Sequence, residues 1–275
     1  MSKFQRIYWS NKFDWNKYSK IYNDYCKTKK NYYSESAQVL VNSIDLSEKL
    51  NVVDLACGTG ALTNQLLKKY EKINIFAIDL SKDMLKFYKE NFKDQIKNGQ
   101  IKAISGNAEI LNKYTKDKFD IVFITCALWD LEIEETLKNI FPLLKQNGKI
   151  VFNLPALVVE KERGFIFFIE HFFRQSLNSD ILYRRIKMKE LFDIFNRQHY
   201  NLVSLSDYSF NLTKKNVEDF FDLLRYRYPF ILFPESMPYE EKLEKCTKTF
   251  IDSLRYVPKD GISEEGVVFV IQKND

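Results

Sequence analysis

The sequence has few of the residues that build a metal centre, a disulfide framework or a membrane span. Only four of its 275 residues are cysteines, at positions 26, 57, 126 and 246, and they form no Cys-x-x-Cys pair. This spacing predicts neither metal nor disulfides and favours a reducing compartment, the cytoplasm. No apolar run reaches the ~18 residues that a bilayer span needs, and residues 1–15 lack the apolar core of a signal peptide. We therefore expect no membrane partner.

Positive charge is present but is not concentrated anywhere. The chain carries 42 Lys and Arg against 37 Asp and Glu, which gives a formal net charge of +5. The lysines are scattered and form no block, a pattern typical of a solvated surface, so a nucleic-acid partner is not favoured. Hydrophobic residues make up 45% and charged residues 29%. These proportions are typical of a globular chain that can bury a core.

From residue 51 onward, short apolar runs alternate with amphipathic stretches. Strands separated by helices indicate βαβ units, right-handed crossovers and a parallel sheet with helices on both faces. The expected fold class is therefore α/β, with a doubly wound, mostly parallel sheet. Strands are expected at 51–55, 73–78, 101–105, 119–125, 148–154, 202–208 and 266–272, and helical stretches near 62–70, 82–96, 108–113, 132–144 and 187–198.

The segment VVDLACGTGALT, residues 52–63, carries the strongest chemical signal. Gly58 and Gly60 let the backbone turn tightly and approach a ligand, and the following helix offers its free N–H groups. Asp54 precedes the glycines, and Thr63 replaces the third glycine of a dinucleotide fingerprint, which favours a cationic amine over a pyrophosphate. Asp79 ends the next strand, where an acid can accept both hydroxyls of a ribose.

Together these residues resemble the class I S-adenosylmethionine-dependent methyltransferase family. The glycine motif of that family runs apolar, apolar, Asp or Glu, apolar, any residue, Cys or Gly, Gly, Thr, Gly, and VVDLACGTG fills every position. The resemblance covers residues 51–153 well and the remainder only by general layout. It implies a Rossmann-like methyltransferase fold with helical lid insertions, and S-adenosylmethionine as the cofactor.

The resemblance also implies which residues surround the cofactor. The glycine turn should flank the methionine moiety, Asp79 the ribose, and the turn after the third strand the adenine. Asn107 stands where the family often has Asp, and its carbonyl can still accept a hydrogen bond. The cofactor residues implied in the core are Asp54, Ala56, Cys57, Gly58, Gly60, Asp79, Leu80, Met84, Asn107, Ala108 and Cys126.

Aromatic residues are dense before the core, in FDWNKYSKIYNDY and beyond. Their three- and four-residue spacing is typical of a helix that packs an apolar stripe onto the core. Methyltransferases of small molecules resemble this chain in placing such a helix over the cofactor. Tyr18, Tyr22 or Tyr32 would then bind the cofactor carboxylate, with Tyr22 also a candidate catalytic residue.

A general base must titrate near neutral pH, and the chain has only two histidines. His171, beside Glu170 in an aromatic insertion, is the better catalytic candidate; a packing or surface histidine is the alternative. The insertions at 155–186 and 211–260 hold most of the later Phe residues, including Phe168 and Phe172.

Three regions are expected along the chain. Residues 1–46 form an N-terminal helical lid, and residues 47–154 form the cofactor-binding Rossmann-like core. Residues 155–275 complete the core and carry the aromatic-rich insertions. Since ligands bind at the carboxyl edge of such a sheet, we expect these insertions to form the acceptor pocket.

The leading function is methyl transfer from S-adenosylmethionine to a small molecule with an apolar or aromatic part. The alternative keeps fold and cofactor but cyclises or eliminates the cofactor itself, releasing methylthioadenosine. A non-catalytic subunit is disfavoured by the intact motifs, and base methylation by TCALWD, residues 125–130, which lacks an Asn/Asp-Pro-Pro-aromatic motif. The acceptor and the oligomeric state, monomer or homodimer, are left open.

Overall fold

The computed structural model describes residues 15–45, 50–177, 185–233 and 236–274. Strands and helices alternate through the first half, as the apolar pattern predicts. The strands are β1 (Asn51–Leu55), β2 (Asn74–Asp79), β3 (Ile101–Ser105), β4 (Phe119–Ile124), β5 (Leu144–Pro155), β6 (Tyr200–Leu212) and β7 (Ile262–Lys273). The α-helices are α1 (Trp15–Cys26), α2 (Tyr32–Asn42), α3 (Ala61–Lys69), α4 (Lys82–Asn91), α5 (Lys93–Lys97), α6 (Ile133–Ile140), α7 (Phe165–Leu177), α8 (Met188–Arg197), α9 (Lys214–Leu232) and α10 (Tyr239–Ser253). Short 3-10 helices are η1 (Ala108–Lys113), η2 (Leu128–Asp130), η3 (Phe141–Leu143) and η4 (Leu254–Tyr256).

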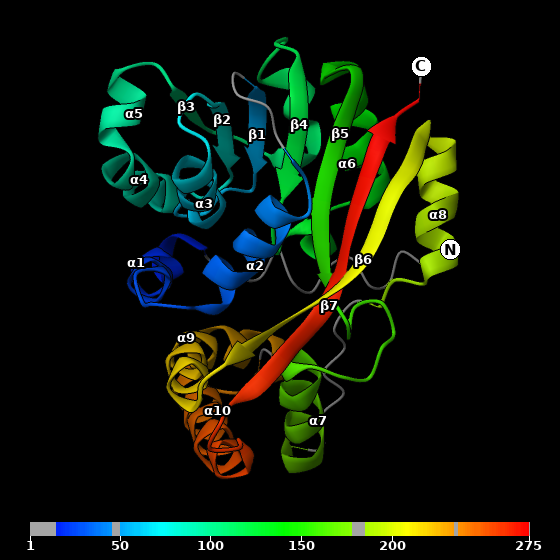
Figure 1. Cartoon of the computed structure of the whole chain (residues 1–275). Coiled ribbons are helices and arrows are strands. Elements are labelled where there is room, and N and C mark those ends of the chain that lie inside the picture. Colours follow the sequence, from blue (N-terminus) through cyan, green and yellow to red (C-terminus); the bar gives the residue numbers. More distant parts are fainter. Residues whose placement is uncertain (1–14, 46–49, 178–184, 234–235, 275) are drawn as a thin grey trace.

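The strands form one sheet in the order β3-β2-β1-β4-β5-β7-β6 (Figure 1). The neighbouring strands from β3 to β5 run parallel, and β7 is antiparallel to both β5 and β6. The predicted doubly wound, mostly parallel sheet is thus confirmed. The strand order reverses between β1 and β4, and ligands bind at such a switch point in open α/β sheets.

Helices cover both faces of the sheet. On one face α2, α3 and α4 place Leu40, Leu66 and Tyr88 against the strands, all fully or almost fully buried. On the other face α6 and α8 place Leu137 and Leu191 against the same strands. Because both faces are covered, the central strands are apolar on both sides, as their sequences predict.

A second hydrophobic cluster joins α1, α7, α9 and α10 with the first residues of α2, whose later residues pack on the sheet. We call α1, α2, α7, α9 and α10 the lid helices. Figure 1 shows α7, α9 and α10 grouped at one end of the long strands β6 and β7. Their shared cluster contains Tyr25, Phe165, Phe220 and Phe250, each no more than 4% exposed. Most of the aromatic residues in the insertions thus build a second core. The division of the chain into regions 1–46, 47–154 and 155–275 stays a prediction.

Several boundaries differ from the expected ones. The stretch at 82–96 is two helices, because Phe92 leaves the helical conformation (φ −124°, ψ 30°) as its ring packs on Tyr88, 4.8 Å between centroids. The stretch at 132–144 ends as an α-helix at Ile140, since Pro142 has no N–H to donate to the preceding turn. In the aromatic stretch at 155–186, the described α-helix is α7 alone.

Candidate functional site

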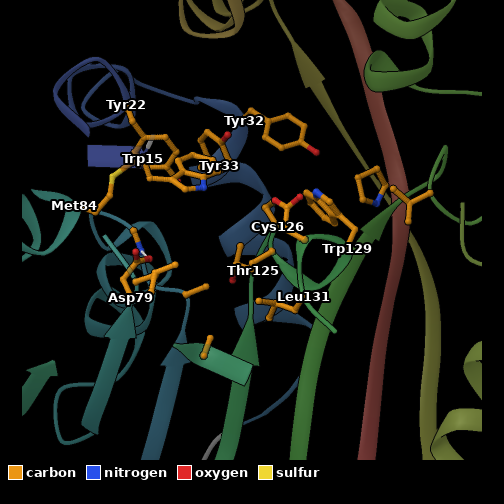
Figure 2. Close-up of a pocket in the computed structure, with 18 of the residues that line it drawn as sticks. Trp15, Tyr22, Tyr32, Tyr33, Asp79, Met84, Thr125, Cys126, Trp129 and Leu131 are labelled. Atoms are coloured by element: carbon orange, nitrogen blue, oxygen red, sulfur yellow. Dashed lines mark hydrogen bonds between the residues drawn. The ribbon is translucent and has the colours of Figure 1, made fainter. Parts of the chain in front are cut away.

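A cavity of about 260 Å³ lies at the carboxyl ends of the parallel strands, beneath the lid helices (Figure 2). Its floor comes from the turns after β1 to β4, and its roof from α1 and α2. Residues of α7 and α9 close the remaining side. The cavity therefore occupies the place where the sequence predicts a cofactor, and it also touches both aromatic insertions.

The glycine turn contributes two of its four expected residues to the cavity wall. Ala56 (φ 58°) and Gly58 (φ 54°) line the cavity, whereas Cys57 and Gly60 do not. A Cβ on Gly58 would lie 3.4 Å from the ring of Tyr22, so this backbone lies directly under an aromatic side chain. A Cβ on Gly60 would lie 2.1 Å from Cε2 of Phe92. Gly60 is thus required by packing and by its φ of 99° rather than by a ligand.

Asp79 projects from the end of β2 into the cavity (Figure 2). Its Oδ2 accepts the backbone N–H of Gly58 at 2.8 Å, and its Oδ1 accepts that of Ser81 at 2.8 Å. Burial raises the pKa of this carboxyl above its ordinary value, and the two backbone donors oppose that shift. Each oxygen keeps a lone pair, so a fixed carboxylate can still accept two hydroxyls of a ligand.

Asp54 lies beneath the turn rather than in the cavity wall. The hydroxyl of Thr63 donates to its Oδ2 at 2.7 Å, and Thr63 also bonds the hydroxyl of Tyr88 at 2.8 Å. Burial raises the pKa of Asp54 to about 7. Its contacts join β1 to α3, so Asp54 acts on the cavity through the position of the glycine turn.

The next part of the wall is apolar with one amide. Leu80, Met84, Asn107 and Ala108 all line the cavity. Leu80 is 67% exposed directly beside Asp79, an unusual position for a leucine. The side chain of Asn107 already accepts the backbone N–H of Glu109 at 2.9 Å and caps η1. Three of these four residues therefore present apolar side chains to the cavity close to the Asp79 carboxyl.

Four aromatic rings of α1 and α2 form the roof, and the sequence pattern identified only two of them. Tyr22 and Tyr32 line the cavity together with Trp15 and Tyr33 (Figure 2). The rings of Tyr22 and Tyr33 lie 4.7 Å apart, and Trp15 meets Tyr22 edge-on at 6.5 Å. Tyr18 is elsewhere: its hydroxyl donates to the carbonyl of Leu223 and fastens α1 to α9.

Cys126 follows β4 and lines the cavity with a φ of 52°. Asn153 holds this strained turn, because its Oδ1 accepts the backbone N–H of Cys126 at 3.0 Å. Its Nδ2 also donates toward the Cys126 sulfur at 3.6 Å and the Tyr208 hydroxyl at 3.4 Å. Burial raises the pKa of the Cys126 thiol to about 12, so the group is neutral at physiological pH.

The side of the cavity away from Asp79 is mostly apolar. Ile166 of α7 and Phe220 and Leu224 of α9 contribute to it. The Phe residues singled out in the sequence do not: Phe168 and Phe172 are partly buried outside the cavity, with Phe172 against Tyr256 at 5.5 Å.

His171 is exposed on α7 and does not line the cavity. Its Nε2 lies 2.9 Å from Nε2 of Gln175, and its ring packs on Phe167. Glu170 cannot orient it, because consecutive helical residues point in different directions and Glu170 is buried against Arg185 at 3.0 Å. The structure thus places the expected base outside the cavity, and Tyr22 is the catalytic candidate that remains in it.

Other lining residues were not named individually as site candidates from the sequence, although the segment 125–131 was expected at the mouth of the site. Those after β3 and β4 follow predicted strand ends, so position alone was a usable signal. Those of the lid have no local signal, because folding brings them in from distant segments. The set comprises Trp15, Tyr33, Glu109, Thr125, Ala127, Trp129, Asp130, Leu131, Pro155, Val158, Ile166, Phe220 and Leu224.

In the described part of the chain, no helix combines enough length with enough apolar character to cross a membrane.

Comparison with known proteins identifies the family. A family model described as a methyltransferase domain matches residues 46–197. A malonyl-[acyl-carrier protein] O-methyltransferase of Priestia megaterium is 27% identical over 142 residues, which cover 50% of this chain and 48% of that protein. The match thus spans about half the length of the relative.

Solved structures share the fold over a longer stretch. The [4+2]-cyclase SpnF aligns with a TM-score of 0.62 and 12% identity, over 94% of this chain and 93% of that one. A phosphoethanolamine N-methyltransferase 2 of Haemonchus contortus, in complex with S-adenosyl-L-methionine, aligns with a TM-score of 0.57 and 15% identity, over 94% and 57%. At such identities the likeness concerns the fold. From its glycine turn, the acid ending β2, its strand order and the matching family model, the chain belongs to the methyltransferase-domain family of class I, S-adenosylmethionine-dependent enzymes.

Proposed function

We propose that this protein transfers the methyl group of S-adenosylmethionine to a small acceptor with an apolar or aromatic part. One observation carries the proposal: a single cavity joins the cofactor-type wall to an apolar wall built by the lid. Asp79 and Gly58 belong to the first wall, and Ile166, Phe220 and Leu224 to the second. A cofactor on the first wall and an acceptor on the second would thus share one cavity, as a transfer reaction requires.

The residues present fit the cofactor. Asp79, fixed by two backbone N–H groups, would hold the ribose hydroxyls, and exposed Leu80 with Met84 would cover the adenine. A side chain larger than hydrogen on Gly58 would narrow the space beneath Tyr22. The Tyr22 hydroxyl would bind the methionine end, and Asp54 would act only through the turn. Asp54, Cys57, Gly60 and Tyr18 support this arrangement by packing and hydrogen bonding.

When bound, S-adenosylmethionine supplies a methyl group that the positive sulfonium has already activated. The chain must then position the acceptor, exclude water and accept a proton if the acceptor carries one. The rings of Trp15, Tyr22 and Tyr33 present negative faces that suit a nearby cation. Burial raises the pKa of Tyr22 well above its ordinary value, so its hydroxyl stays protonated and acts as a donor.

The alternative reaction uses the cofactor alone. Cyclisation or elimination would release methylthioadenosine and would need no second-ligand wall. The related fold of a [4+2]-cyclase supports the general point that this architecture accommodates different chemistries. The apolar wall of Ile166, Phe220 and Leu224 favours an acceptor, and hence methyl transfer, over this alternative.

The test is an incubation with S-adenosylmethionine, alone and with a pooled small-molecule extract, followed by mass spectrometry. S-adenosylhomocysteine formed only with extract supports methyl transfer and reveals the mass of the acceptor. Methylthioadenosine formed without extract favours the alternative. The variant Asp79→Asn, which removes one charged oxygen from the cofactor wall, serves as the control and should form much less product. Absence of any cofactor binding would refute the proposal.

A further inference from the structure

Glu264 is a buried carboxyl behind the acceptor side of the cavity. It lies on β7, is 1% exposed, and its Oε2 accepts the backbone N–H of Ile166 at 3.0 Å. Ile166 belongs to the first turn of α7 and lines the cavity. The carboxyl is therefore separated from the cavity by one residue. Its other oxygen, Oε1, is buried and has no hydrogen-bond partner among the described residues.

Capping of α7 does not account for this residue completely. One oxygen is enough to accept the N–H of Ile166 at the N-terminus of α7. Burying an unpaired carboxylate oxygen has a cost in stability, which suggests a partner that binds later. The contact with the N-terminus of α7 therefore does not explain the unpaired Oε1 of Glu264.

Tyr32 connects this carboxyl to the ligand space: its ring packs on Phe210 at 5.9 Å between centroids, and Phe210 pairs with Glu264 across β6 and β7. Tyr32 lines the cavity, and Figure 2 shows its hydroxyl pointing away from Trp15 and Tyr33. Burial raises the pKa of Tyr32 well above its ordinary value, and the nearby Glu264 adds to the shift. Burial also raises the pKa of the wall residue Cys126, with a smaller contribution from Glu264.

The charged side chains that line the cavity in the described part of the chain are all acidic. Among the described residues that line the cavity, Asp79, Glu109 and Asp130 are acidic, and none is Lys, Arg or His. The aromatic roof adds the negative faces of several rings. Such a wall favours a cation and disfavours an anion.

We propose that the acceptor carries a protonated amine, held at the lid side of the cavity by Tyr32 with Glu264 as its counter-charge. This inference rests on the methyl transfer proposed above and names the class of its acceptor. An acidic acceptor, such as the malonyl group in the name of the Priestia megaterium relative, would meet no cation in the described wall.

The protonation state of Glu264 should change when a cation binds, and this change can be measured. Burial raises its pKa to about 8, with Glu265 adding to the shift and the backbone N–H groups of Ile166 and Phe165 opposing it. The other titratable groups facing it, Tyr32, Tyr208 and Cys126, have pKa values raised by burial and stay neutral. At pH 7 only about one Glu264 in ten is ionised, so a bound cation ionises it and releases a proton.

The experiment titrates protein saturated with S-adenosylhomocysteine by calorimetry, with 2-phenylethylamine and 3-phenylpropionate as matched probes. At pH 8 the amine should bind at least about tenfold more tightly than 3-phenylpropionate. Its affinity should rise by up to about tenfold per pH unit from pH 6 and level off near pH 8. Buffers of different ionisation enthalpy should reveal nearly one proton released per amine bound at pH 7.

Variants test whether Glu264 causes the proton release and the pH dependence of amine binding. Glu264→Gln should abolish the proton release and the pH dependence and lower amine affinity by about tenfold, with S-adenosylhomocysteine affinity unchanged. The neighbouring Glu265→Gln is the matched control, because Glu265 pairs with Arg163 at 2.7 Å. It should keep the proton release and the pH dependence, with affinity levelling off at a slightly lower pH because Glu265 helps to raise the pKa of Glu264. Should Glu264→Gln not fold, Tyr32→Phe still tests the contact and should weaken amine binding severalfold.

Three results would contradict the inference about the amine. Equal or tighter binding of 3-phenylpropionate, failure of the amine to bind, or binding without proton release overturns the inference and leaves the proposed methyl transfer intact. Failure of S-adenosylhomocysteine to bind the wild-type protein overturns the proposed function and this inference with it.

Discussion

At the scale of single residues, the two glycines of one motif have different structural roles. The glycine motif is complete, but Gly58 faces the cavity while Gly60 faces the ring of Phe92. Sequence predicts that both glycines are needed, and it cannot tell which one serves the ligand. That distinction depends on Phe92, which lies 32 positions further along the chain and packs against Gly60 only after folding.

Gly60→Ala should destabilise the fold. The new Cβ would lie 2.1 Å from Phe92, and the φ of 99° is unfavourable for alanine, so we expect a loss of about 3 kcal/mol in unfolding free energy. Urea denaturation measures it. Gly99→Ala is the control, since its φ is 82° but no atom lies within 4 Å of the added Cβ. Equal losses in the two variants would contradict the packing role of Gly60.

Asp79→Asn should weaken cofactor binding, with a loss of about 1–3 kcal/mol in stability because one backbone N–H loses its acceptor. The amide keeps one acceptor oxygen for Gly58 or Ser81 but loses the charge that strengthens bonds to ribose hydroxyls. We expect the Kd of S-adenosylhomocysteine to rise about tenfold to a hundredfold. Calorimetry measures the Kd, with His171→Ala as a control that leaves it unchanged because His171 lies outside the cavity. A Kd for Asp79→Asn within twofold of the wild type would refute the ribose contact.

At the scale of elements, the core follows from local pattern and the lid does not. The strands from β1 to β4 lie within a residue of their expected positions, because apolar runs and glycine turns are local signals. The lid helices are recognisable as aromatic, yet which aromatics face the ligand is decided by contacts between distant segments. Phe220 is an example: it contacts Tyr25, Tyr32 and Phe165, from three other helices.

Two residues of α7 should therefore differ in their effect on the acceptor. Ile166→Ala removes a cavity-wall side chain and should raise the acceptor KM about tenfold, while cofactor Kd stays unchanged. Phe172→Ala, on the same helix, removes a larger side chain that packs on Tyr256 outside the cavity. It should leave the acceptor KM within about twofold. Steady-state kinetics with the acceptor found by mass spectrometry measure both, and the reverse ranking would place the acceptor elsewhere.

At the scale of the whole molecule, folding buries acids that prefer to be neutral. Burial raises the pKa of Asp54 to about 7 and that of Glu264 to about 8. Since the folded state binds these protons more tightly than the unfolded state, their contribution is full below about pH 4 and is lost as pH rises through the folded values. Sequence reasoning identified Asp54 from its motif, but Glu264 has no motif and is identified only by its burial.

Stability should therefore fall with rising pH between pH 5 and 7. Each of these two groups contributes a slope of about 1.4 kcal/mol per pH unit between pH 5 and 6, and the slope from Asp54 falls to about half of that near pH 7. Asp54→Asn keeps an acceptor for the Thr63 hydroxyl and removes one titrating group, so its curve should be flatter by about that slope. Urea denaturation at pH 5, 6 and 7 measures the difference. Parallel curves for the two proteins would show that Asp54 is ionised in the folded state.

The place of β7 in the sheet has a consequence for biosynthesis. β7 pairs with β5 on one side and β6 on the other, although β6 is made first. On the ribosome, β6 thus has no neighbour in the sheet until residues 262–273 emerge. A chain stopped before residue 262 would expose two further strand edges, one on β5 and one on β6, and would lack Glu264; open edges promote aggregation. Nascent chains should therefore depend on chaperones until the last strand is inserted.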